Sequence, residues 1–143
     1  MLELSDEAHE RIVSHARECH PEEACGILGG EHGEERSTAE TAHPAENASP
    51  VPEREYEIDP AEQFELMEAI EGADREVAGF YHSHPHGPTE PSATDGARAT
   101  WDGYSYVVVS LAGDSPEVNA WRWTGESFER EALGVESASE TTE

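Results

Sequence analysis

The chain has 143 residues, enough for one domain with a moderate hydrophobic core and too few for two. It carries 33 Asp plus Glu against 8 Lys plus Arg, a formal net charge of −25, and all eight cations are arginine. Nucleic-acid binding starts with neutralisation of phosphates by Lys and Arg, so this balance argues against a nucleic-acid partner. No apolar run reaches the roughly 18 residues of a membrane-spanning helix, so no membrane partner is expected.

The N-terminal residues 1–7 are acidic and lack the basic and apolar regions of a signal peptide, so we expect a cytoplasmic protein. At about 1 M salt the Debye length falls to roughly 3 Å and surface charges are screened, so the composition favours a halophilic archaeon. Cys19 and Cys25 are expected as thiols in a cytosolic setting. A metal site of these cysteines with His20 is an alternative, although the spacing matches no established zinc pattern.

The first half of the chain predicts one helix followed by two strands. Residues 2–19 have apolar side chains at helical spacing, with Ser5 as the N-cap and His20-Pro21 as the end. Residues 24–28 form a short apolar run closed by two glycines, which predicts a buried strand. Residues 37–43 alternate weakly and predict a second strand.

An irregular, mobile loop is expected over residues 44–55, which contain three prolines. Residues 56–58 predict a short strand. A helix ending at Gly72 follows, with Asp59 as its N-cap and Glu62 as the capping-box partner. The buried side of this helix is expected to carry Phe64, Met67 and Ile70.

The residues after the next apolar run, 77–80, carry the chemistry. His82 and His84 lie two apart on the predicted strand and therefore share a face. Ser92 and Asp95 form the Ser-x-x-acid pattern of a helix N-terminus. Two imidazoles and one carboxylate supply the ligands of a tetrahedral Zn²⁺ with a fourth position open for water, as in catalytic sites. A lone His-x-His is common on surfaces, but the full pattern predicts a zinc hydrolase.

The remaining elements are expected as a short helix over residues 92–101, a central strand over 104–111, and a hairpin of 118–123 with 127–131. Trp121 and Trp123 share one face of the hairpin and are expected to pack in the core. Residues 136–143 are rich in Ser, Thr and Glu, so we expect a domain over residues 1–135 followed by an acidic disordered tail. The order of elements predicts an α+β domain with a mixed β-sheet flanked by helices.

The pattern His-x-His-Pro, then seven residues, then Ser-x-x-Asp, together with an upstream Glu, resembles the JAMM (MPN+) zinc metalloproteases. The resemblance covers roughly residues 5–132. It implies that His82, His84 and Asp95 are the zinc ligands and that Ser92 lies beside the reacting carbonyl. The family's Glu-x-Cys-Gly-(aliphatic)-Leu-x-Gly segment is matched from Glu23 onward. The resemblance therefore implies Glu23 as the catalytic carboxylate, whereas the residues alone leave Glu22 and Glu23 as alternatives.

The same resemblance implies a single-domain JAMM/MPN-like fold, layered like that of cytidine deaminases. It also implies a zinc-dependent isopeptidase that cuts after the Gly-Gly tail of a ubiquitin-like modifier joined to a protein lysine. In that reaction Glu23 takes a proton from water and later delivers it to the leaving amine, while Ser92 stabilises the oxyanion. A peptidase that trims a sulfur-carrier protein and a non-catalytic scaffold remain alternatives, and His86 is a loop residue with no assigned role.

We predict that the folded state becomes more stable as salt increases, because a net charge of −25 makes the chain repel itself at low ionic strength. Between about 0.1 and 2 M KCl the Debye length shrinks from roughly 10 Å to about 2–3 Å, which screens that repulsion. Thermal unfolding across this range should show a rising midpoint. A midpoint that does not change with KCl would contradict the halophilic interpretation.

Overall fold

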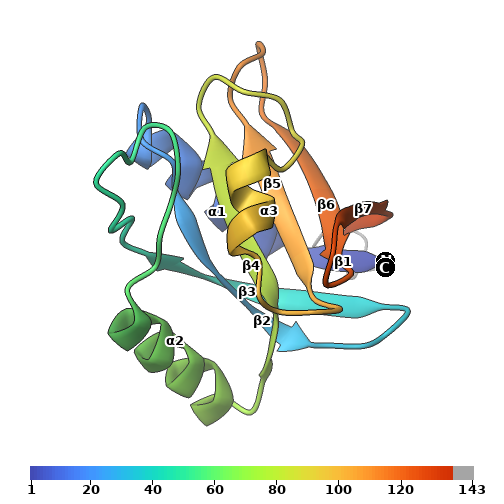
Figure 1. Ribbon diagram of the computed structural model, residues 1–143. Coiled ribbons are helices and arrows are strands. Elements are labelled where there is room, and N and C mark those ends of the chain that lie inside the picture. Colours follow the sequence, from blue (N-terminus) through green and yellow to red (C-terminus); the bar gives the residue numbers. More distant parts are fainter. Residues whose placement is uncertain (137–143) are drawn as a thin grey trace.

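The computed structural model describes residues 1–136, which form one mixed sheet of eight strands and three helices (Figure 1). In chain order the strands are β1 (Leu2–Ser5), β2 (Cys25–Glu31), β3 (Ser37–Ala45), β4 (Glu76–His84), β5 (Ser105–Ser110), β6 (Glu117–Trp123), β7 (Phe128–Glu131) and β8 (Leu133–Glu136). The helices are α1 (Asp6–Cys19), α2 (Pro60–Gly72) and α3 (Ala93–Arg98). Within the sheet the strand order is β7-β6-β5-β4-β2-β3-β1-β8.

The helices cover both faces of the sheet. Figure 1 shows α3 in front of β4 and β5, with α1 behind the sheet. On the α1 face, Ile12 and Ala16 of the helix pack with Tyr81 of β4 in one buried cluster. On the other face, Ile70 of α2 packs with Phe80, the neighbouring residue of β4, in a second cluster. The expected α+β fold with a flanked mixed sheet is therefore confirmed, and alternate residues of β4 serve opposite faces.

The helix starts follow the local signals. Ser5 caps α1, its hydroxyl oxygen accepting from the N–H of Ala8 at 3.0 Å. Asp59 caps α2 as expected. Glu62, however, does not complete a capping box, because its Oε1 accepts from the backbone N–H of Glu46 at 2.9 Å. The carboxylate thus ties α2 to the preceding loop.

Two expectations for residues 56–70 are wrong. Residues 56–58 are not a strand, because the N–H of Glu57 bonds the Asn47 side chain and its carbonyl bonds Ala48 N–H. Phe64 is 62% exposed, while Leu66 and Met67 face the second buried cluster beside Ile70. Met67 and Ile70 belong to the buried side of the helix whether residue 64 or residue 66 is the third buried position. The helical spacing alone therefore did not show which of these two side chains is buried.

Two strands are not predicted by the sequence pattern. β1 has four residues and pairs in parallel with β3 on one side and β8 on the other. Strands this short carry little periodic signal, and their pairing is decided by distant partners. β8 includes Glu136, the last of the described residues, so the expected disorder of residues 137–143 lies outside them.

The hairpin of β6 and β7 is confirmed, and Cys19 and Cys25 are free thiols as expected. The helix after Ser92 ends at Arg98, before the expected residue 101. None of the helices within residues 1–136 is long and apolar enough to cross a membrane.

We predict that stability falls as the pH drops below about 6.5, the ordinary pKa of histidine. Burial lowers the pKa of His15, with Arg11 adding to the effect and Glu18 opposing it. Its Nδ1 lies 2.7 Å from the Tyr81 hydroxyl. The unfolded chain therefore binds a proton that the folded chain rejects, so stability present above pH 6.5 is lost below it.

Urea unfolding at pH 7.5 and pH 5.5 in high salt measures the loss of unfolding free energy as the pH falls. This difference should be smaller in His15→Gln than in the wild type. His9→Gln, on the same helix, is the matched control and should keep the wild-type difference. An equal pH dependence in His15→Gln and wild type would contradict the prediction.

Candidate metal centre

The pairing of β2 with β4 places three candidate residues on one face of the sheet. In this antiparallel pair Cys25 lies opposite His82. Continuing the same register by two residues places Glu23 opposite His84. Side chains directly opposite each other, and those two residues apart on one strand, point to the same face. Glu23, His82 and His84 therefore converge at the end of the two strands.

Asp95 reaches the same point from α3. Its backbone N–H donates to Ser92 Oγ at 3.1 Å, and its Oδ2 accepts from Ser92 N–H at 2.7 Å, a complete capping box. The predicted helix N-terminus is therefore confirmed. The cap also fixes the direction of the carboxylate, because Oδ2 lies 3.0 Å from His82 Nε2 and 3.2 Å from His84 Nε2.

Glu23, His82, His84 and Asp95 form a buried cluster in which one ligand atom from each lies within 4.8 Å of the others. It is the only such group of three or more potential ligands within the described residues. The cluster includes neither of the two cysteines, and it includes neither His20 nor His86. Within the described residues, the alternative of a metal site built on Cys19, Cys25 and His20 is therefore not supported.

The donor atoms of the cluster fit a cation. His84 Nδ1 donates to the carbonyl of Pro88 at 2.7 Å, so the neutral ring has its lone pair on Nε2. That Nε2 lies 3.2 Å from His82 Nε2 and 3.2 Å from Asp95 Oδ2. If the proton of His82 lies on its Nδ1 as well, the three atoms present only lone pairs to one another, and a cation between them would remove that repulsion. Two imidazole nitrogens and a carboxylate are ligands that suit a transition metal such as zinc.

The two carboxylates of the cluster have pKa values displaced in opposite directions. Burial raises the pKa of Glu23 to about 7, with His84 lowering it and Asp95 and Glu55 raising it further. Burial would also raise the pKa of Asp95, but the two adjacent imidazoles of His82 and His84 and the backbone N–H of Ser92 hold that pKa well below its usual range. Glu23 Oε1 is buried and has no hydrogen-bond partner among the described residues. The surroundings therefore drive the pKa values of the two carboxylates apart, upward for Glu23 and downward for Asp95.

Three residues that position the cluster were not identified from the sequence. The Tyr56 ring stacks on the imidazole of His82, with ring centroids 4.5 Å apart. Ser83, between the two histidines, accepts from the N–H of Ala24 at 2.8 Å through its Oγ. Asn47 Nδ2 donates to the carbonyl of Glu23 at 3.0 Å. Each of these contacts joins segments that are distant along the chain, so the local sequence does not reveal them. The one exception is Ser83, whose place between His82 and His84 could have suggested a role at the site.

The loop after β4 is held by the neighbouring strands. Ser110 donates to the carbonyl of Gly87 at 2.6 Å, and Trp121 Nε1 donates to the carbonyl of Thr89 at 2.9 Å. Trp123 packs in the core as expected, whereas Trp121 is half-buried and anchors this loop. These bonds fix residues 85–91, including the carbonyl that orients His84.

A cleft of about 360 Å³ opens at the cluster, and its lining includes Glu23, His84, Arg54 and Ser92. Ser92 is exposed at the rim of this cleft. His86 also lines the cleft, is exposed, and lies edge-on to His20 with ring centroids 5.1 Å apart.

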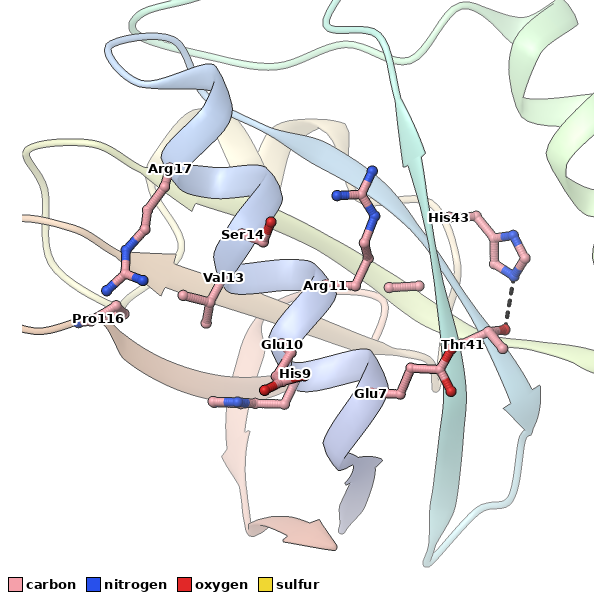
Figure 2. Close-up of a pocket in the computed structure, with 11 residues that line it drawn as sticks. Glu7, His9, Glu10, Arg11, Val13, Ser14, Arg17, Thr41, His43 and Pro116 are labelled. Atoms are coloured by element: carbon pink, nitrogen blue, oxygen red, sulfur yellow. Dashed lines mark hydrogen bonds between the residues drawn. The ribbon is translucent and has the colours of Figure 1, made fainter. Parts of the chain in front are cut away.

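A larger groove of about 930 Å³ follows α1 and reaches β3 and Pro116 (Figure 2). Figure 2 shows Arg11, Arg17 and Glu7 on the helix, and His43 of β3 bonded to Thr41. Among the described residues that line it, none belongs to the cluster. Because α1 covers the face of the sheet opposite to His82, this groove is a separate surface.

The fold is that of JAB/MPN domains: a mixed sheet flanked by helices. At the ends of β2 and β4 it carries Glu23, His82 and His84, joined by Asp95 from α3 as potential metal ligands. The sequence model of the prokaryotic homologs of the JAB domain matches residues 5–124, and the chain belongs to that family. The family resemblance drawn from the His-x-His and Ser-x-x-Asp motifs is thereby confirmed.

Two curated relatives and one solved structure illustrate this membership. The chain is 42% identical over 139 residues to a desampylase of Haloferax volcanii, covering 94% of this chain and 96% of that protein. It is 41% identical over 99 residues to a CysO-cysteine peptidase of Mycobacterium tuberculosis, covering 69% of this chain and 66% of that protein. A JAB1/MPN domain protein from Archaeoglobus fulgidus shares the fold, with a TM-score of 0.62, 19% identity, and coverage of 94% of this chain and 98% of that chain.

We predict that Ser83→Ala lowers the free energy of unfolding by about 1–3 kcal/mol, because it leaves the buried N–H of Ala24 without an acceptor. Ser83→Thr keeps the hydroxyl and should lose less. Chemical denaturation of both variants in molar salt measures the difference. If Thr proved as damaging as Ala, side-chain volume rather than the hydrogen bond would be the cause.

Proposed function

We propose that the chain is a zinc-dependent isopeptidase that hydrolyses the bond after the Gly-Gly tail of a ubiquitin-like modifier attached to a protein lysine. The observation that carries the proposal is the convergence of Glu23 with His82, His84 and Asp95 in one buried cluster. The substrate class rests on the likeness to the Haloferax desampylase, which extends over 94% of this chain.

His82, His84 and Asp95 are the proposed ligands of one Zn²⁺. The ion supplies a Lewis acid and lowers the pKa of water. Three protein ligands leave a coordination position for water or substrate, which is the property of a catalytic rather than a structural zinc. The Pro88 carbonyl keeps the proton on Nδ1 of His84, so that Nε2 is available as a ligand.

Glu23 is the proposed general base and then the general acid. A carboxyl with a pKa of about 7 accepts and releases protons near neutral pH, where catalysis by proton transfer is most effective. Its Oε1 makes no hydrogen bond to another group among the described residues, so no other group competes for the proton that it is proposed to carry. Ser92 Oγ accepts the N–H of Asp95, which leaves the hydroxyl hydrogen to be donated to the developing oxyanion at the cleft rim.

A second candidate function is a peptidase that trims the C-terminus of a sulfur-carrier protein, favoured by the likeness to the mycobacterial CysO-cysteine peptidase. A non-catalytic scaffold would have no need of a buried four-residue cluster, because unpaired polar groups are costly to bury. The isopeptidase, the trimming peptidase and the scaffold can be distinguished by which substrates the protein cleaves.

The deciding experiment incubates the protein at molar salt with three substrates: a modifier joined to a lysine side chain, a linear modifier fusion, and a modifier extended by one amino acid. We expect the isopeptide to be cleaved fastest and a chelator to stop the reaction. Cleavage restricted to the one-residue extension would favour the trimming peptidase, and no cleavage of any substrate would favour the scaffold.

The metal assignment predicts that His82→Ala lowers zinc content sharply, because it removes one of three protein ligands. Elemental analysis of the purified protein measures the zinc stoichiometry, about one per wild-type chain. His86→Ala is the matched control, since His86 lies in the next loop, outside the cluster, and should keep its zinc. Unchanged zinc in His82→Ala would overturn the ligand set.

The base assignment predicts that Glu23→Gln keeps zinc but loses turnover by about 10²–10⁴-fold, because an amide accepts no proton. Glu22→Gln is the neighbouring control and should remain active, since Glu22 is exposed whereas Glu23 is buried. If Glu22→Gln were the inactive variant, the assignment would be off by one residue.

A further inference from the structure

One side chain outside the metal cluster joins Glu23 to the loop beside it. The amide nitrogen of Asn47 donates to the carbonyls of Glu23 at 3.0 Å and Glu55 at 2.9 Å, with a longer contact to Pro52 at 3.3 Å. The amide oxygen of Asn47 accepts from the N–H groups of Ser49 at 3.0 Å and Glu57 at 3.2 Å.

These partners use the whole hydrogen-bonding capacity of the Asn47 amide, which has two hydrogens and one oxygen with two lone pairs. The three contacts of the nitrogen are all carbonyl oxygens, and both contacts of the oxygen are N–H groups. The orientation of the amide is therefore determined by its surroundings, and a flipped amide would oppose donor to donor and acceptor to acceptor.

Glu23 depends on such anchors because it lies before β2 and outside the strand ladder. Its N–H donates to the carbonyl of Pro52 at 2.8 Å, and its own carbonyl accepts from Asn47. The next residue, Ala24, is tied to Ser83 on the other side. Because Oε1 has no hydrogen-bond partner among the described residues, these backbone bonds are the contacts that hold Glu23 from its main chain.

The loop that Asn47 organises is also a wall of the site. Tyr56 stacks on the imidazole of His82, and Arg54 lines the cleft that contains Glu23. Ala48 N–H donates to the carbonyl of Glu57 at 2.8 Å, which closes the loop at its base. One amide thus connects the wall of the cleft with the backbone of the proposed base.

We propose that Asn47 is a positioning residue that holds the carboxylate of Glu23 in its catalytic place and couples it to the loop of residues 48–57. The proposal rests on the proposed function, since it gives Glu23 a proton-transfer role. A displacement of about 1 Å in a reacting group costs on the order of 10²-fold in rate. Loss of the Asn47 amide therefore lowers kcat. A change that disturbs only the loop of residues 48–57, which lines the cleft, is expected to raise KM instead.

The test compares three variants. Asn47→Ala removes all the bonds and should lower kcat by about 10²-fold. Asn47→Asp keeps the acceptor for Ser49 and Glu57 but removes the donors, so it should lower kcat as well. Ser49→Ala is the control within the same loop: it removes the bonds of Ser49 Oγ to Val51 N–H and the Glu55 carboxylate, leaves Asn47 intact, and should keep kcat. Zinc content and melting temperature of each variant verify that the fold is retained.

A double-mutant cycle identifies the residue through which Asn47 acts. In the Glu23→Gln background, Asn47→Ala should cause no further loss of turnover, because the group that it positions is already disabled. Hydrogen exchange gives a readout that needs no turnover. The amide of Glu23 should exchange faster in Asn47→Ala than in wild type, and at the wild-type rate in Ser49→Ala.

Wild-type kcat in Asn47→Ala, or losses that multiply in the Glu23→Gln background, would overturn the proposal. If Asn47→Ala fails to fold, Asn47→Asp takes its place as the test. A lower kcat and a faster exchange of the Glu23 amide in that variant would support the proposal, and wild-type values of both would overturn it. Failure of the proposed function is distinguishable, because it would appear as a wild-type protein that cleaves none of the three substrates. The exchange rate of the Glu23 amide, which donates to the carbonyl of Pro52, would still report whether Asn47 holds this backbone in place.

Discussion

The antiparallel register of β2 and β4 is the constraint on which the site depends. With Cys25 opposite His82, the carboxylate of Glu23 faces the same side of the sheet as the two imidazoles. A slip of one residue would turn Glu23 to the α1 face and bring Glu22 toward His84. Ser83 secures this register at the strand end, because its N–H and hydroxyl bond the carbonyl and N–H of Ala24.

The other half of the site comes from a helix of only six residues. A helix this short is not stable by itself, so its position depends on packing and on its cap. Ser92 and Asp95 form that cap, and the same Asp95 oxygen that completes it faces both histidines. The bonds that start the helix therefore also aim the carboxylate. Trp121 and Ser110 hold the intervening loop, so the separation of the two halves is fixed from the sheet side.

Electrostatics separates the roles of the two carboxylates in the cluster. Asp95 accepts the N–H of Ser92 and lies against two imidazoles, which lower its pKa, while burial raises the pKa of Glu23 to about 7. Pairs of titratable groups whose pKa values are driven apart by their surroundings are the usual arrangement of acid–base sites. Here the contrast arises from the Ser92 cap and the adjacent imidazoles at Asp95, and from burial at Glu23.

The sequence by itself determined the parts of the site that depend on short-range geometry. His82 and His84 share a face because strand side chains alternate, and Ser92 with Asp95 caps a helix because residues three apart meet in its first turn. Only the tertiary structure decided what depends on distant partners. It placed Glu23 rather than Glu22 beside the histidines, a choice that the residues alone left open and the family resemblance implied. It turned Phe64 outward and paired β1 with β8. It also brought Tyr56 and Asn47 to the site, because their contacts join segments that no local pattern connects.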